Sequence, residues 1–132
     1  MPIRNELSGL AAAIGAALLA TTVVVGQPAR ADSVSFSEDV MPILEHQCLE
    51  CHTPGGPGFM ESGLDLSTYD GVMQGTSYGV VVIPGQPMNS NLVRVIMGQV
   101  DPSIRMPQYR RPLPPRMTET IMRWVGEGAL DN

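Results

Sequence analysis

The 132-residue sequence predicts a small all-α domain made of short helices and long loops. Two stretches, near residues 39–52 and 115–126, repeat apolar side chains at helical spacing. Residues 80–83 alone have the composition of a strand, and Pro84-Gly85 stops that stretch at once. Twelve prolines and fourteen glycines divide the rest into short pieces. The length allows one domain.

The N-terminal residues 1–31 have the pattern of an export signal. Arg4 precedes an apolar stretch over residues 7–25, and Ala29-Arg30-Ala31 fits the A-x-A cleavage rule. We therefore expect a cut after Ala31 and a folded domain over 32–132, located in the periplasm or otherwise outside the cytoplasmic membrane. Because the apolar stretch nearly spans a bilayer, the alternative is an uncleaved membrane anchor formed by residues 7–25.

The first helix of the domain is expected to begin near Asp39, behind a capping hydroxyl at Ser37. Pro42 fits only the first turn of such a helix. We expect the helix to end around Cys51 or His52, since the run over 53–58 is too rich in proline and glycine to continue it.

Further elements follow from capping and breaking residues. The box Ser67-x-x-Asp70 predicts a short helix over about 68–73, and 75–79 reads as a turn. Residues 80–83 predict an extended connector with at most one minimal β pairing. Ser90 or Asn89 is expected to cap another short helix that stops at Gly98. Residues 99–115 predict a long loop, and the last helix is expected from Pro115 to about Gly126.

Cys48-Leu49-Glu50-Cys51-His52 has the spacing of a c-type haem attachment motif. Two thiols at this spacing can add to the vinyl groups of one porphyrin, and His52 then lies under the iron as its proximal ligand. A thioredoxin-like motif would follow a strand, and a tight C-x-x-C disulfide would more often be redox-active than structural. A zinc site would lack ligands, because only His46 and His52 accompany the cysteines. We expect one covalent haem c with its iron, and a solvated His46.

A sixth iron ligand is sought among the methionines. Met60 is too close in sequence to His52 to reach the opposite face of a porphyrin. Met106 lies far along the chain in the long loop, where Pro107 fixes the backbone after it. Met88, in a proline-rich turn, is the alternative. The remaining candidates lie inside expected helices and are assigned to packing: Met41, Met73, Met97, Met117 and Met122.

The charge of the chain excludes one class of partner. The net charge is −5, and no lysine follows residue 31. A chain this acidic is not expected to bind nucleic acid. Within 32–132 every basic residue is an arginine at or after Arg94. These arginines are expected either to face haem propionates or an acidic redox partner, or to be scattered and solvated.

Taken together, the motifs resemble those of class I cytochromes c, and more narrowly the single-haem domains found free or fused to periplasmic dehydrogenases. The resemblance rests on a helix leading into the C-x-x-C-H motif, the stretch 63–67, the pair Met106-Pro107, and Trp124 before a Gly-Ala end. It implies an all-α cytochrome c fold with crossed first and last helices, thioether bonds at Cys48 and Cys51, and His52 and Met106 as axial ligands. Two sets of side chains would pack across the helices: Val40, Ile43 and Leu44 against Ile121, Trp124 and Val125.

The expected function is that of an electron carrier between periplasmic redox partners, rather than that of an enzyme. Burial of the haem would favour the ferrous state, and we expect it to come from Leu64, Leu66, Val82, Ile83 and Leu92. If no methionine binds, the alternative is a five-coordinate haem sensor or a peroxidase-like protein. A haem-bearing subunit of a larger dehydrogenase or respiratory complex is a further alternative.

Overall fold

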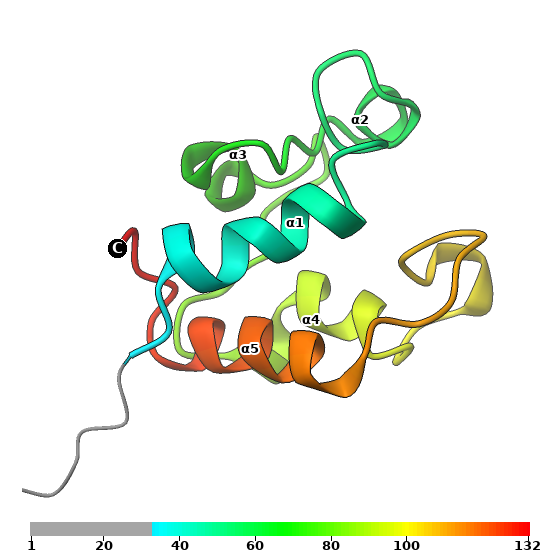
Figure 1. The fold of residues 1–132 in the computed structure, drawn as a ribbon. Helices are drawn as coiled ribbons and strands as arrows, with labels where there is room; N and C mark the ends of the chain where they lie inside the picture. The colour runs from blue at the N-terminus through cyan, green and yellow to red at the C-terminus, as the bar shows by residue number, and fades with distance from the viewer. Residues whose placement is uncertain (1–32) are drawn as a thin grey trace, which may run out of the picture.

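The computed structural model describes residues 33–132, so the expected signal segment and anchor lie outside the described part. The described chain is all-helical, which confirms the predicted fold class (Figure 1). Its elements are η1 (Phe36–Val40, a π-helix), α1 (Met41–Gln47), α2 (Pro57–Ser62), α3 (Tyr69–Gln74), η2 (Pro87–Asn89), α4 (Asn91–Ile96), η3 (Pro102–Ile104) and α5 (Pro115–Gly126). Among these residues, the β pairing consists of one bridge between Thr76 and Gly79, and no helix is long and apolar enough to cross a membrane.

The first helical segment begins earlier and ends earlier than the sequence predicted. Ser35, not Ser37, is the N-cap, and its hydroxyl accepts a hydrogen bond from the Glu38 amide. The backbone at Ser35 is extended, as a capping residue requires. α1 ends at Gln47, and turns carry the chain through the haem motif: the amides of Cys51 and His52 both donate to the Cys48 carbonyl.

Helix α2 was not predicted. The run over 53–58 contains two prolines and three glycines, which predicts a loop, but Pro57 occupies the first turn of α2, where its missing amide costs nothing. Gly63 ends the helix with a left-handed φ of 74°, a conformation that costs glycine little.

The middle of the chain follows the prediction with two corrections at caps. Thr68, not Ser67, caps α3 by accepting from the Gly71 amide at 3.0 Å, because Ser67 is engaged by the Asp65 carboxylate. Ser90 precedes α4 as predicted, but its hydroxyl donates to Gln86 instead of capping the helix.

The remaining predictions of this region hold. Residues 80–83 form no β pairing and include a bend at Val81, and Gly98 ends the segment after α4 with a φ of 70°. The last helix has the predicted bounds Pro115–Gly126.

The core forms where η1 and α4 pack against α5 (Figure 1). Trp124 of α5 is 1% exposed, and its ring centroid lies 5.3 Å from that of Phe36. The two sets of side chains implied by the resemblance are buried in one cluster, which confirms that the first and last helical segments pack together.

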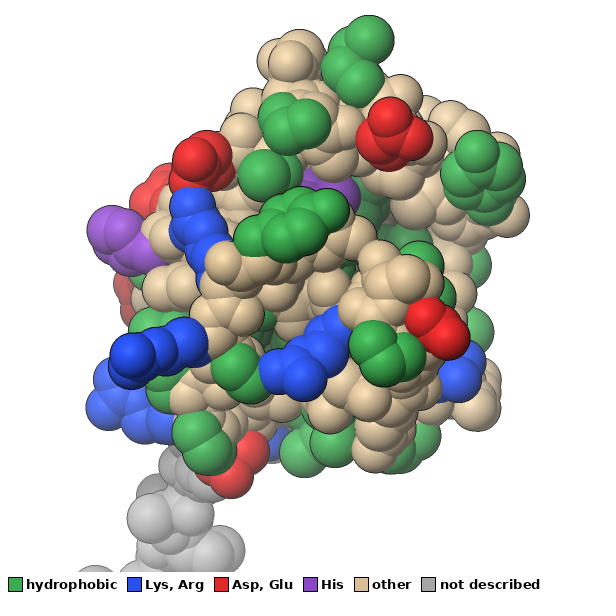
Figure 2. Space-filling view, turned by 90° about the vertical axis from the view of Figure 1, so that its right-hand side faces the viewer, with side chains coloured by type: hydrophobic (Ala, Val, Ile, Leu, Met, Phe, Trp, Pro, Cys, Tyr) green, Lys and Arg blue, Asp and Glu red, His purple; other side chains and the backbone are tan. Residues whose placement is uncertain are grey.

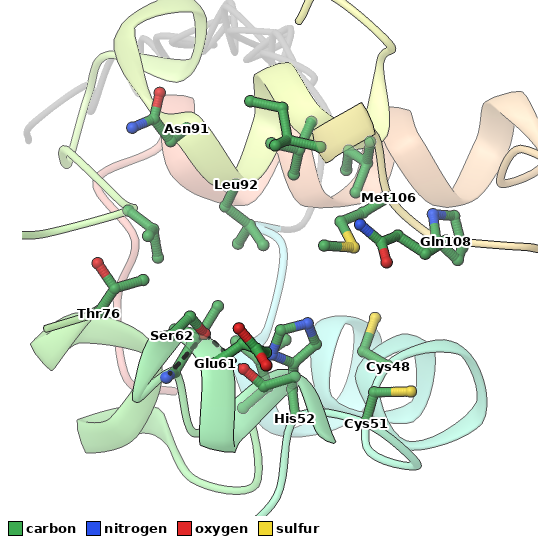
Figure 3. Close-up of a pocket in the computed structure, with 18 of the residues that line it drawn as sticks. Cys48, Cys51, His52, Glu61, Ser62, Thr76, Asn91, Leu92, Met106 and Gln108 are labelled. Carbon is green, nitrogen blue, oxygen red and sulfur yellow. Dashed lines mark hydrogen bonds between the residues drawn. The ribbon is translucent and has the colours of Figure 1, made fainter. Parts of the chain in front are cut away.

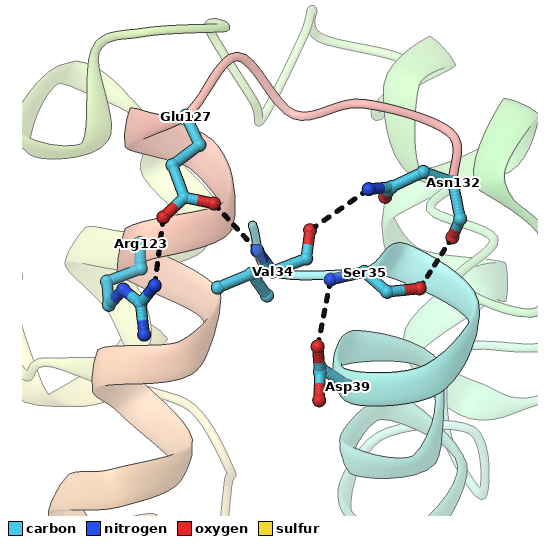
Figure 4. A network of polar contacts seen from close by, with 6 residues as sticks. All are labelled: Val34, Ser35, Asp39, Arg123, Glu127 and Asn132. Carbon is cyan, nitrogen blue, oxygen red and sulfur yellow. Dashed lines mark hydrogen bonds and ion pairs between the residues drawn. The ribbon is translucent and has the colours of Figure 1, made fainter. Parts of the chain in front are cut away.

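A polar network joins the start of the described chain to α5 and Asn132 (Figure 4). The Val34 amide donates to the Glu127 carboxylate at 2.7 Å, and Arg123 donates to the same carboxylate at 3.0 Å. The Ser35 hydroxyl donates to the Asn132 carbonyl at 2.7 Å. The strand-like lead into η1 is therefore tied to the C-terminal segment by bonds across more than ninety residues.

Candidate haem site

A cavity of about 1020 Å³ opens between the wall formed by the haem motif and α2 and the wall formed by α4 and the loop after it (Figure 2). Figure 2 shows this face of the molecule hollowed. The volume lies at the upper end of the roughly 300–1,000 Å³ typical of ligand sites, as a large flat ligand requires. The lining is mainly apolar and includes Leu64, Leu66, Val81, Leu92, Ile96 and Leu113.

The two cysteines lie side by side on one flank of the cavity (Figure 3). Cys48 is half-buried, Cys51 is exposed, and both thiols are free, so the pair does not form the disulfide considered above. Burial raises the pKa of Cys48 to about 11, against the opposing charge of Arg110, while Cys51 adds to the rise. Two free thiols at one edge of an apolar cavity fit attachment to a porphyrin edge.

His52 is held at the base of the same flank. Its carbonyl accepts a hydrogen bond from the Leu66 amide at 2.8 Å, and His52 as a whole is only 8% exposed. Burial lowers the pKa of His52, and the nearby Leu64 carbonyl opposes this shift. The neutral imidazole that burial favours is the form that binds a metal.

The two ring nitrogens of His52 have different surroundings. Nδ1 is buried without a hydrogen bond of normal geometry. Figure 3 shows the ring directed across the cavity toward Met106. The ring is thus fixed by packing, and its cavity side is left for a ligand.

Met106 lies on the opposite wall. Its amide donates to the Val95 carbonyl of α4 at 3.1 Å, and the following bond to Pro107 is cis. Among the described residues, Met106 is the only methionine that lines the cavity. Met88 in η2 is 49% exposed and Met60 in α2 is 73% exposed, and both lie outside the lining. The structure therefore brings Cys48, Cys51, His52 and Met106 to one cavity.

One part of the expected apolar wall is wrong. Val82 and Ile83 do not line the cavity, whereas Val81 does. Val80 lines the cavity as well, whereas Val82 is 2% exposed and belongs to the hydrophobic core.

Two of the six arginines in residues 33–132, Arg94 and Arg110, line the cavity. Arg110 forms an ion pair with Glu50, which lies between the two cysteines. This pairing could not be predicted from the sequence, because its partners are sixty residues apart. The remaining arginines, Arg105, Arg111, Arg116 and Arg123, lie outside the lining.

The donor set suits haem better than a bare metal ion. No group of three or more histidine, cysteine or acidic side chains in residues 33–132 could hold a metal ion, so a zinc site finds no support there. An imidazole, a thioether sulfur and two free thiols are instead the groups that hold a haem c.

Comparison with known proteins points to the same group. A family model described as Planctomycete cytochrome C matches residues 48–108, a segment that contains Cys48, Cys51, His52 and Met106. No curated protein and no solved structure gives a significant match. The match and the C-x-x-C-H spacing support a cytochrome c-type domain that carries a covalently bound haem c with its iron.

Proposed function

We propose that the protein is a single-haem c-type cytochrome that transfers one electron at a time, with His52 and Met106 as the axial ligands. One observation carries the proposal. His52 and Met106 face each other across the cavity that Cys48 and Cys51 flank (Figure 3). A haem c bound there supplies a one-electron iron couple.

The protein groups around the site favour the reduced state. The thioether of Met106 is a softer ligand than a second imidazole, so a His/Met pair gives a higher reduction potential than a His/His pair. The apolar walls work in the same direction, because a low dielectric disfavours the additional charge of the ferric iron.

Ligands on both faces leave no open position for a substrate, which supports an electron carrier rather than an enzyme. The partners would be redox proteins that approach the cavity mouth. A periplasmic location is supported by the export pattern of residues 1–31, and membrane attachment would depend on retention of residues 7–25.

The absorption spectrum of the oxidised wild-type holoprotein tests this function. We expect a low-spin spectrum with the weak near-red band of sulfur-to-iron charge transfer. A high-spin spectrum would contradict the proposal and favour a five-coordinate sensor or peroxidase-like protein.

Mass spectrometry of the exported protein tests haem attachment and signal cleavage. It should show the mass of one added haem and a start at Asp32, and a haem-free mass would reject haem attachment.

A further inference from the structure

Gly58, in the first turn of α2, lies directly against the His52 side chain. A Cβ atom at this position would lie 2.7 Å from Cε1, 2.9 Å from Nε2 and 3.0 Å from Nδ1 of the imidazole. The backbone of Gly58 is not left-handed, so its conformation would accept any residue. The space beside His52, and not the backbone, therefore requires glycine here.

The three distances place the contact on the face of the ring. An atom beyond Cε1 in the ring plane would be much closer to Cε1 than to either nitrogen, whereas the three distances are nearly equal. The backbone of Gly58 therefore covers one face of the imidazole. A methyl group added there would overlap the ring.

The helix that carries Gly58 is tied to the haem motif and to the turn after α3. The Phe59 amide donates to the Cys51 carbonyl at 2.9 Å, and the Ser77 amide donates to the Ser62 carbonyl at 2.8 Å. A Cβ on Gly56 would lie 2.6 Å from the Cys51 carbonyl oxygen, so the two segments are already in close contact. Because α2 has little freedom to move away, a methyl group added at Gly58 would push the imidazole of His52 out of its position.

We propose that Gly58 is a positioning residue that fixes the orientation of the His52 imidazole. The proposal rests on the function proposed above, in which His52 is an axial ligand. Groups that orient a ligand of a metal also tune the metal, so the rotation of this ring about its bond to iron is set by the backbone of α2. The glycine-rich run after the haem motif then holds the His52 ring in its orientation, in addition to linking the motif to α2.

A pair of glycine-to-alanine variants tests the proposal. Gly58→Ala is compared with Gly126→Ala in α5, where an added Cβ would meet only Pro87 Cγ at 3.8 Å. Alanine favours a helix over glycine at both sites, so helix propensity alone predicts no loss in either variant. We expect Gly58→Ala to shift the electron paramagnetic resonance g values and the midpoint potential of the holoprotein. Gly126→Ala should match wild type. Wild-type values in Gly58→Ala would overturn the proposal.

Nuclear magnetic resonance of the reduced wild-type holoprotein gives a second test that needs no variant to fold. The contact predicts nuclear Overhauser effects between the Gly58 Hα protons and the His52 Hε1 proton. Their absence would overturn the proposal even if Gly58→Ala failed to attach haem. The near-red band of the wild type keeps the two proposals separable: if it is missing, Met106 ligation is wrong, while the contact between Gly58 and His52 is still measured.

Discussion

At the scale of the residue, Glu127 links stability to pH. The hydrogen bond from the Val34 amide is the main cause that lowers the pKa of Glu127, and Arg123 adds to the effect (Figure 4). A carboxyl group with a lowered pKa in the folded state stabilises the fold above the pKa it has in the unfolded chain. That contribution is lost as the pH falls through the folded pKa.

Glu127→Gln should therefore weaken the acid dependence of stability. We expect the wild type to lose more free energy of unfolding than Glu127→Gln when the pH is lowered from 6 into the range below the usual glutamate pKa of roughly 4.3. Urea titrations at a series of pH values measure the difference. Glu119→Gln in α5, the helix that ends just before Glu127, is the control, since Glu119 makes no ion pair within residues 33–132. Parallel curves for wild type and Glu127→Gln would contradict the assignment.

Single residues of the site were predictable where their signal is local. The cysteines and His52 follow from a five-residue motif, and Met106 from a loop with a following proline. Gly58 could not be assigned in this way, because a glycine that ends a helix and a glycine that touches a ring look alike in sequence. The nearest signal was the density of glycine directly after the motif.

At the scale of the element, the ion pair between Arg110 and Glu50 joins the loop that carries Met106 to the turn that carries the cysteines. Both side chains are largely exposed, so the pair is worth about 1 kcal/mol or less. Its position matters more than its strength, because opening the loop would carry Met106 away from the cavity.

Arg110→Gln should make the loop open more easily, in a manner that depends on salt. In low salt we expect the near-red band to be lost at a lower urea concentration than in the wild type. The corresponding free energy of loop opening should fall by about 1 kcal/mol or less. Near 1 M salt, where the screening length is about 3 Å, the difference should vanish. Arg111→Gln is the control, because Arg111 is in no ion pair of the described chain. An equal effect of Arg110→Gln at both salt concentrations would show that the Arg110–Glu50 ion pair does not hold the loop in place.

The elements themselves were largely predictable, and their ends were not. α5 has its predicted bounds because Pro115 is well suited to the first turn of a helix and because apolar side chains recur on one face along the helix. The caps at Ser35 and Thr68 were misassigned because neighbouring hydroxyl residues compete and the tertiary structure decides between them. Ser37, for example, donates to the Asn132 carbonyl, a partner ninety-five residues away. α2 was missed since prolines and glycines mark loops and the starts of helices equally.

At the scale of the whole molecule, the one hundred described residues fold around an open cavity of about 1020 Å³. Small domains bury a limited apolar core, and this one has its apolar residues arranged around a space. The bound group therefore supplies part of the core. The C-x-x-C-H motif predicts that a haem is attached. The shape of the cavity could not be predicted, because it depends on how the two halves of the chain pack against each other.

Haem removal should consequently cost much of the stability. For the haem-free chain with Cys48→Ala and Cys51→Ala we expect a loss of about 5 kcal/mol or more, comparable to the whole stability of a small domain. Thermal unfolding followed by circular dichroism, with proton spectra at room temperature, measures it. Cys51→Ala alone keeps one attachment and should lie between the double variant and the wild type. A haem-free double variant with the wild-type midpoint and well-dispersed resonances would show that the core is complete without the group.

Ligation of both faces of one haem by His52 and Met106 can be measured through the near-red band of the oxidised Met106→Ala variant. Met88→Ala is measured beside it, since Met88 was the alternative and lies outside the cavity. We expect Met106→Ala to keep its covalent haem and lose the band, while Met88→Ala keeps both. A band that survives in Met106→Ala and disappears in Met88→Ala would show that Met106 is not the sixth ligand.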